Sequence, residues 1–229
     1  MTAKALRPRS FIALIAVLLL AACAAPSRDT APTGRVTTGV SHQGAAPLSP
    51  ADMSLRAQGF IYAASQVEPV AERICRERAP QRNCDFQIVI DDQSDIGPNA
   101  YQTLDRSGRP IVAITLPLLF MVANSDEIAF VLAHEAAHHI EGHLERRSQS
   151  VAQLGEILGS MVYSKEFELQ ADALGTLIAA EAGFDPLRGS ALFFRIPDPA
   201  GRILSSHPAN AERLDVIRRT YANYMARRS

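Results

Sequence analysis

The segment HEAAHHIEGH, residues 134–143, places four histidines and two glutamates within ten positions of a predicted helix. An α-helix turns by about 100° per residue, so side chains four positions apart lie on one face, one turn apart. His134 and His138 can therefore bind the same metal ion. Glu135 points aside, where it can reach a water molecule on that ion. The spacing predicts two metal ligands and one general base on a rigid helix.

A third ligand is found in ELQAD, where Glu168 and Asp172 again share one helical face. Glu168 would complete a site of two histidines and one glutamate for one Zn²⁺ per chain, with the fourth position open for water. Asp172 would accept a hydrogen bond from the far nitrogen of a zinc-bound histidine and fix its tautomer. Glu166 is a rival ligand, although its neighbour four residues on is Gln170. The alternative is a solvated acidic face.

His139 and His143 are also four apart and could form a second metal pair on another face. No glutamate follows His139, however, because the next residue is Ile140. The alternative is that both histidines make local hydrogen bonds, with His143 supporting the helix. We favour this second interpretation.

Apolar periodicity predicts a mostly helical α+β domain with a small antiparallel sheet. A first helix covers residues 51–78, where Pro69 is expected to kink or split it. FQIVIDD, PNAYQTL and PIVAITL alternate as strands, with a hairpin turn at DRSGR. The helix that carries His134 should begin near Asn124, with Glu127 completing a capping box.

Further helices are expected over residues 164–182, ended by Gly183, and in DPLRGSALFFRI. The terminal helix follows SSHP and tolerates Pro208 in its first turn. Within the helix beginning near Asn124, an apolar stripe should face the core, and it consists of Ile128, Val131, Leu132, Ala136 and Ile140.

Residues 1–22 have the pattern of a secretory signal, with three basic residues before the apolar run 11–22, which is too short to span a bilayer comfortably. LLLAACAAP resembles a bacterial lipobox that lipidates Cys23, and the alternative is an ordinary cleavage site beside an incidental cysteine. Residues 23–50 are expected to form a flexible tether and residues 51–229 the catalytic domain. Ala24, rather than Asp, favours the outer membrane, facing the periplasm of a Gram-negative bacterium.

Cys75 and Cys84 are close in sequence, and export would place them in an oxidising compartment. We expect a disulfide, with two separate buried thiols as the alternative. The 23 basic and 24 acidic residues form no basic patch, so a nucleic-acid partner is not expected. With six histidines and no histidine-rich tract, zinc buffering is also a poor interpretation.

HExxH followed by ExxxD, then SHP and an arginine that opens a terminal helix, resembles the gluzincin zinc metallopeptidase family that includes HtpX, the CAAX prenyl endopeptidase, BepA and YcaL. The resemblance covers residues 51–229 and implies a minimal gluzincin fold. It assigns zinc binding to His134, His138 and Glu168, the general base to Glu135, and the supporting carboxylate to Asp172. The lack of a later membrane helix or tetratricopeptide array places the chain closest to a short lipoprotein branch.

The resemblance implies a zinc endopeptidase that cleaves unfolded or misassembled outer-membrane proteins, held to the membrane through Cys23. His207 is a second catalytic candidate: it could stabilise the oxyanion, occupy the fourth zinc position, or only cap the helix. Arg213 is expected to anchor the same helix by an ion pair. The alternative function is a periplasmic assembly factor that binds unfolded proteins with little proteolysis, although structural zinc usually has four protein ligands.

Overall fold

The computed structural model describes residues 49–92, 97–154, 156–195 and 209–229. The elements follow one another in this order: α1 (Pro50–Arg78), β1 (Gln87–Asp91), β2 (Ala100–Leu104), β3 (Pro110–Thr115), α2 (Leu116–Met121), α3 (Ser125–Ile140), α4 (His143–Leu154), α5 (Glu156–Glu181), α6 (Pro186–Gly189), the 3-10 helix η1 (Ser190–Phe194) and α7 (Asn210–Ala226). The expected α+β, mostly helical fold is confirmed. In the described residues no helix has both the length and the apolar character needed to cross a bilayer.

Helix α1 begins one residue before the expected start of the folded part. Ser49 caps it, because the Ser49 hydroxyl accepts from the Asp52 amide while the Asp52 carboxylate accepts from the Ser49 amide. Of the two effects expected of Pro69, a split does not occur, because α1 continues through it. Pro69 lies on the exposed side, where water can satisfy the carbonyl that it leaves unpaired, while Val67 and Ala71 hold the opposite side in the core.

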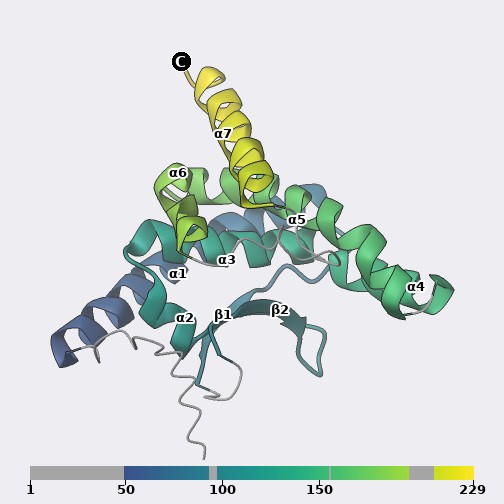
Figure 1. Cartoon of the computed structure of the whole chain (residues 1–229), viewed down its shortest axis with the longest axis horizontal. Coiled ribbons are helices and arrows are strands. Elements are labelled where there is room, and N and C mark those ends of the chain that lie inside the picture. Colours follow the sequence, from purple (N-terminus) through teal and green to yellow (C-terminus); the bar gives the residue numbers. More distant parts are fainter. Residues whose placement is uncertain (1–48, 93–96, 155, 196–208) are drawn as a thin grey trace, which may run out of the picture. The chain divides into compact units, whose positions relative to one another are not determined.

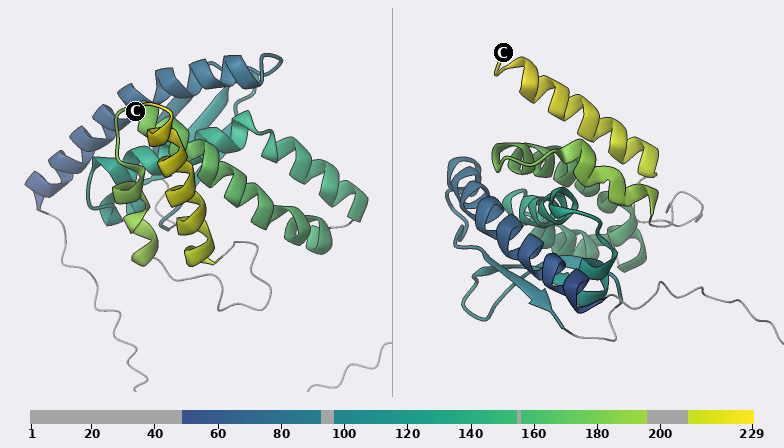
Figure 2. Two further views of the ribbon diagram at one scale, coloured as in Figure 1. Left: turned by 90° about the horizontal axis from the view of Figure 1, so that it is seen from above. Right: turned by 90° about the vertical axis from the view of Figure 1, so that its left-hand side faces the viewer.

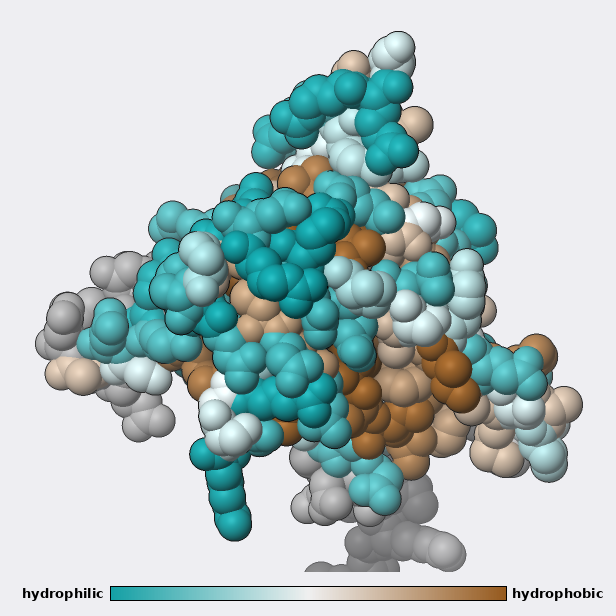
Figure 3. Space-filling view, turned by 180° about the vertical axis from the view of Figure 1, so that it is seen from behind, coloured by the Kyte–Doolittle hydropathy of each residue, from teal (hydrophilic) through white to brown (hydrophobic). Residues whose placement is uncertain are grey.

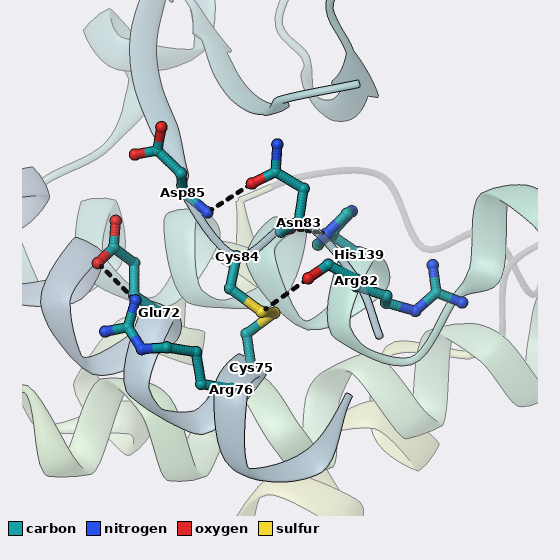
Figure 4. The surroundings of a disulfide bond; sticks show 8 residues. All are labelled: Glu72, Cys75, Arg76, Arg82, Asn83, Cys84, Asp85 and His139. Carbon is teal, nitrogen blue, oxygen red and sulfur yellow. Dashed lines mark hydrogen bonds and ion pairs between the residues drawn. A yellow bond between two sulfur atoms is a disulfide. The ribbon is translucent and has the colours of Figure 1, made fainter. Parts of the chain in front are cut away.

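A disulfide joins the last turn of α1 to the chain that leads into β1 (Figure 4). Cys75 and Cys84 have Cα atoms 5.7 Å apart, and both side chains are buried. The adjacent Asn83 carbonyl lies 2.8 Å from Nε2 of His139 on α3. The disulfide therefore fixes a segment that also contacts the helix with the histidines.

The sheet is mixed rather than antiparallel, which corrects our prediction. Its order is β1-β3-β2, with β3 antiparallel to β2 but parallel to β1. The expected hairpin between β2 and β3 is present, and Gly108 takes a positive φ of 81° in its turn. Strand β3, the second strand of the hairpin, lies between β2 and β1 and therefore pairs with a strand that runs in its own direction. Strand β2 is therefore an edge strand.

Helix α3 is central to the core. It packs against α1, α5 and the sheet, and its predicted stripe of apolar residues is buried. Figure 1 and the right-hand view of Figure 2 show the sheet on one side of α3 and α5 on the other, with α7 beyond α5. Asn124 caps α3 as expected, but the Glu127 carboxylate accepts from the Ala123 amide rather than completing a capping box. Glu127 also forms an ion pair with Arg195.

The C-terminal helices are present as predicted, except that α5 begins at Glu156 rather than at the expected residue 164. Helix α5 ends before Gly183, whose φ of 87° allows the left-handed turn that stops it. The short helix in DPLRGSALFFRI is present as α6 and η1. Helix α7 begins at Asn210, and Pro208 lies outside the described residues.

Helix α7 contacts the domain through its first turns, where Arg213, Leu214 and Ile217 are buried. In Figure 3, seen from behind, α7 at the top is predominantly hydrophilic, whereas hydrophobic residues gather lower on the same face. Helix α7 packs mainly against α5, with further contacts to α6 and η1.

Candidate metal centre

The histidine helix α3 and the acidic helix α5 approach each other closely at Gly175. A β-carbon added to Gly175 would lie 2.9 Å from the His134 Cα and 3.0 Å from its amide nitrogen. Such distances are far inside van der Waals contact, so only glycine permits this helix packing. Asp172 and Glu168 lie about one and two turns, respectively, before Gly175 on α5, and this approach brings them to the histidines.

The structure brings His134, His138 and Glu168 together around one point. Their ligand atoms all lie within 4.8 Å of one another. The Nε2 atoms of the two histidines are 3.0 Å apart, and each lies 3.4–3.5 Å from a carboxylate oxygen of Glu168. Two imidazole nitrogens and one carboxylate oxygen are the donor set of a catalytic zinc site, so these residues fit a zinc ion.

A buried ion pair supports His134. Its Nδ1 lies 3.0 Å from Oδ1 of Asp172, as predicted from the sequence. The Asp172 carboxylate also accepts two hydrogen bonds from Arg213, from Nη2 at 2.7 Å and from Nε at 2.8 Å. The Arg213 guanidinium lies 4.2 Å from the centre of the Phe193 ring. Arg213 thus has the ion-pair partner that the sequence could not identify.

The charges of this site set the protonation of its groups. Burial disfavours a charged His134, but hydrogen bonds to Asp172 and Glu168 outweigh burial and raise its pKa to about 10. Burial, followed by repulsion from His134, lowers the pKa of His138 to about 3. Burial alone would raise the pKa of Asp172, yet its hydrogen bonds with Arg213 and His134 lower it overall. The carboxylates thus favour positive charge at the point where the three ligands meet, as a divalent cation would provide.

A cleft of about 410 Å³ opens beside these ligands. Glu135 lies on its wall together with His134, His138 and Glu168. Residues 98–102, which lead into and form most of the edge strand β2, line the same cleft. The remaining wall is largely apolar, with Leu118, Phe130, Val131, Phe167, Leu192 and Phe193. The cleft can therefore hold an extended chain next to the candidate base and metal ligands.

The comparison with known protein families agrees with this geometry. The sequence profile of peptidase family M48 matches residues 62–159 and 150–221. The chain belongs to peptidase family M48. A search of curated protein sequences finds no match. Membership of the M48 family indicates a zinc metallopeptidase, and the matched residues include both α3 and α5.

Other candidate residues lie apart from the cluster of His134, His138 and Glu168. His139 turns towards Asn83 and Phe86, so it does not pair with His143 as a second metal site. Glu166, the rival ligand, is exposed, and its Oε1 accepts a hydrogen bond from Gln170. His207 and Cys23 lie outside the described residues.

The sequence analysis did not single out two glycines that shape the candidate metal centre. Gly175 is a glycine within a predicted helix, a pattern that often marks close packing. Gly142 takes a positive φ of 71° between α3 and α4, where the sequence suggested no break. Because of this turn, His143 lies beside the candidate ligand His138, and the Nδ1 atoms of the two rings are 2.8 Å apart.

Proposed function

We propose that the protein is a zinc-dependent endopeptidase that hydrolyses unfolded or misassembled proteins in the bacterial periplasm. The observation that carries this proposal is the position of Glu135 in an open cleft beside the cluster of His134, His138 and Glu168. A purely structural zinc site usually has four protein ligands and no such cleft. The M48 membership supports the same reaction class.

The proposed mechanism assigns a separate task to each residue. His134, His138 and Glu168 hold the zinc ion. When bound, zinc supplies Lewis acidity, which lowers the pKa of a water molecule and polarises the scissile carbonyl. Glu135 takes the proton from the attacking water and passes it to the leaving amine. Asp172 keeps the His134 ring oriented, and Arg213 keeps Asp172 ionised.

The edge strand β2 supports a preference for unfolded substrates. An extended peptide can pair with the backbone of an edge strand, whereas a folded chain has its own backbone already paired. Residues 98–102 bring this edge into the cleft, and the apolar walls suit hydrophobic side chains. Unfolded outer-membrane proteins, with alternating apolar and polar residues, have the required chemistry.

The proposed location follows from the first residues of the sequence. The signal pattern in residues 1–22, lipidation at Cys23 and the tether 23–50 would hold residues 51–229 at the periplasmic face of the outer membrane. The membrane is then a partner only through the lipid. Labelling with a fatty-acid analogue tests this: wild type should incorporate it and Cys23→Ser should not.

The catalytic proposal is tested with zinc-loaded full-length protein and an unfolded outer-membrane protein. Wild type should produce fragments, and Glu135→Gln should bind the same substrate without cleaving it. Glu141→Gln is the matched control, because Glu141 pairs with Arg78 at the end of the same helix. Binding without cleavage by wild type would favour the alternative, an assembly factor for unfolded proteins.

His207 precedes α7 by three residues and stays a predicted catalytic residue. His207→Ala distinguishes its proposed roles in the same assay. Activity should fall if His207 stabilises the oxyanion, and it should rise if His207 occupies the fourth zinc position.

A further inference from the structure

His143 has no role in the mechanism above, yet it is buried against a predicted zinc ligand. Helix α3 ends at Ile140, and the turn at Gly142 places His143 at the start of α4. Only 4% of His143 is exposed, and its Nδ1 lies 2.8 Å from Nδ1 of His138. Two ring nitrogens at this distance share one hydrogen, so one donates and the other accepts.

The surrounding groups determine which nitrogen donates. Arg146 can only donate, and its Nη2 lies 3.1 Å from Oε1 of Gln170. The other end of the Gln170 amide donates from Nε2 to Glu166 at 2.9 Å. Both contacts orient the amide with its oxygen towards Nε2 of His143, 3.1 Å away. Nε2 of His143 must therefore carry the hydrogen and donate it to Gln170.

This donation has a direct consequence for the zinc ligand. A neutral imidazole with its hydrogen on Nε2 has a lone pair on Nδ1, so His143 accepts from His138. His138 then carries its hydrogen on Nδ1 and keeps the lone pair on Nε2. That Nε2 lone pair faces His134 and Glu168, where the metal would bind.

Aromatic packing holds the His143 ring in place. The ring stacks on Phe167 with centres 4.4 Å apart and planes inclined by 8°. The Arg146 guanidinium lies over the same Phe167 ring, 4.5 Å from its centre. The chain of donors and the stacking together allow one orientation of His143.

We propose that His143 is a positioning residue, which fixes the tautomer and direction of His138 as Asp172 does for His134. This inference rests on the proposed zinc site and assigns His138 an uncharged partner. Ligand histidines are usually held in this way, and loss of the partner costs about 10–100-fold in metal affinity or activity.

The test measures the zinc Kd of the full-length protein by competition with a chromogenic chelator. His143→Phe keeps the ring stacked on Phe167 but lacks the acceptor, so its zinc Kd should rise about 10–100-fold. His143→Asn places an amide oxygen close to the position of Nδ1 and should recover most of this loss. Gln170→Leu should weaken zinc binding less than His143→Phe, and it provides a second variant if the first fails to fold.

His139→Phe is the matched control, since His139 is a buried histidine on the same helix that faces Asn83 instead of the metal ligands. It should leave the zinc Kd unchanged. An unchanged zinc Kd in folded His143→Phe, with wild type binding zinc normally, would overturn the role of His143 and leave the proposed peptidase intact. Failure of wild type to bind zinc would overturn both.

Discussion

The two histidines of the predicted zinc site are supported in different ways. His134 contacts Asp172, whose charge is balanced by Arg213 from the last helix. His138 contacts His143, a neighbour only five residues away. The first support is charged and connects α3, α5 and α7, whereas the second is uncharged and connects the α3–α4 turn with Phe167 and Gln170 of α5.

The difference shows that orienting a ligand and stabilising a fold are separable tasks. The buried Asp172 carboxylate beside His134 requires a counter-ion, and Arg213 on α7 supplies it. The His143 imidazole beside His138 carries no charge, so it requires only a neutral hydrogen-bond acceptor, which is Oε1 of Gln170. We therefore expect damage beside His134 to affect both fold and metal binding, and damage beside His138 to affect chiefly metal binding.

The largest expected effect is that of Asp172→Ala. This change removes both hydrogen bonds that the buried Arg213 guanidinium makes to Asp172 and leaves it the longer 3.5 Å contact with Glu168. The free energy of unfolding should therefore fall by about 3–5 kcal/mol. Urea unfolding of the chelator-treated protein measures the loss independently of zinc. A loss below about 1 kcal/mol, the range of an exposed ion pair, would contradict the account.

A double variant separates the two tasks of this ion pair. Asp172→Leu combined with Arg213→Met replaces the buried charges with apolar groups, which often restores or exceeds the original stability. Stability in urea should recover, but the zinc Kd should stay raised because His134 has lost its acceptor. Recovery of both properties would show that Asp172 does not orient His134.

Removal of the metal should lower stability by an intermediate amount. Zinc at a free concentration of 100 times its Kd adds about 2.7 kcal/mol to the free energy of unfolding. Treatment with a chelator should therefore lower the Tm of wild type and, equally, of Glu135→Gln, whose changed residue is not a ligand. If the chelator lowers the Tm of Glu135→Gln less than that of wild type, Glu135 also contributes to zinc binding and is not only the general base.

Gly175→Ala should cost about 1–3 kcal/mol, because the new methyl group would collide with the backbone at His134. Displacement of α5 should also weaken zinc binding through Glu168. Gly59→Ala is the control, since its β-carbon would meet only side-chain atoms of Ser125 and Ile128, at 3.3–3.4 Å. Equal effects of both substitutions would exclude a special role for the close approach at Gly175.

The smallest expected effect is a difference in how the two supports respond to acid, measured as the change in the free energy of unfolding. Burial lowers the pKa of His143 from 6.5 to about 4, so stability should be lost as the pH falls from 6.5 towards 4, while the unfolded chain takes up a proton. Zinc-free His143→Phe should lose less stability than wild type between pH 7 and pH 5. The pKa of Asp172 is lowered from 3.8, so the stability that Asp172 contributes should stay constant over this range and decline only below pH 3.8. Urea titrations at both pH values measure these differences.

Local patterns were sufficient to predict much of the fold and the residues that form the candidate metal cluster. The helical spacing of His134 and His138, and of Glu168 and Asp172, follows from the geometry of one helix at a time. The cap at Asn124 depends on neighbours a few residues away.

Features that depend on distant segments were not predictable in this way. The parallel pairing of β1 with β3 depends on which strand of the hairpin lies next to β1. The partner of Arg213 lies 41 residues away, and the contact of His143 with His138 depends on the turn at Gly142. The split expected at Pro69 does not occur because long-range packing on both sides of it maintains the helix.

X-ray absorption spectroscopy of the zinc-loaded full-length protein is the decisive test of the proposed zinc site. The account predicts one zinc per chain, bound by two imidazole nitrogens at about 2.0–2.1 Å with only oxygen ligands in addition. Absence of bound zinc would contradict the account. A third imidazole would also contradict it, because His207 or another histidine would then close the position that the reaction requires.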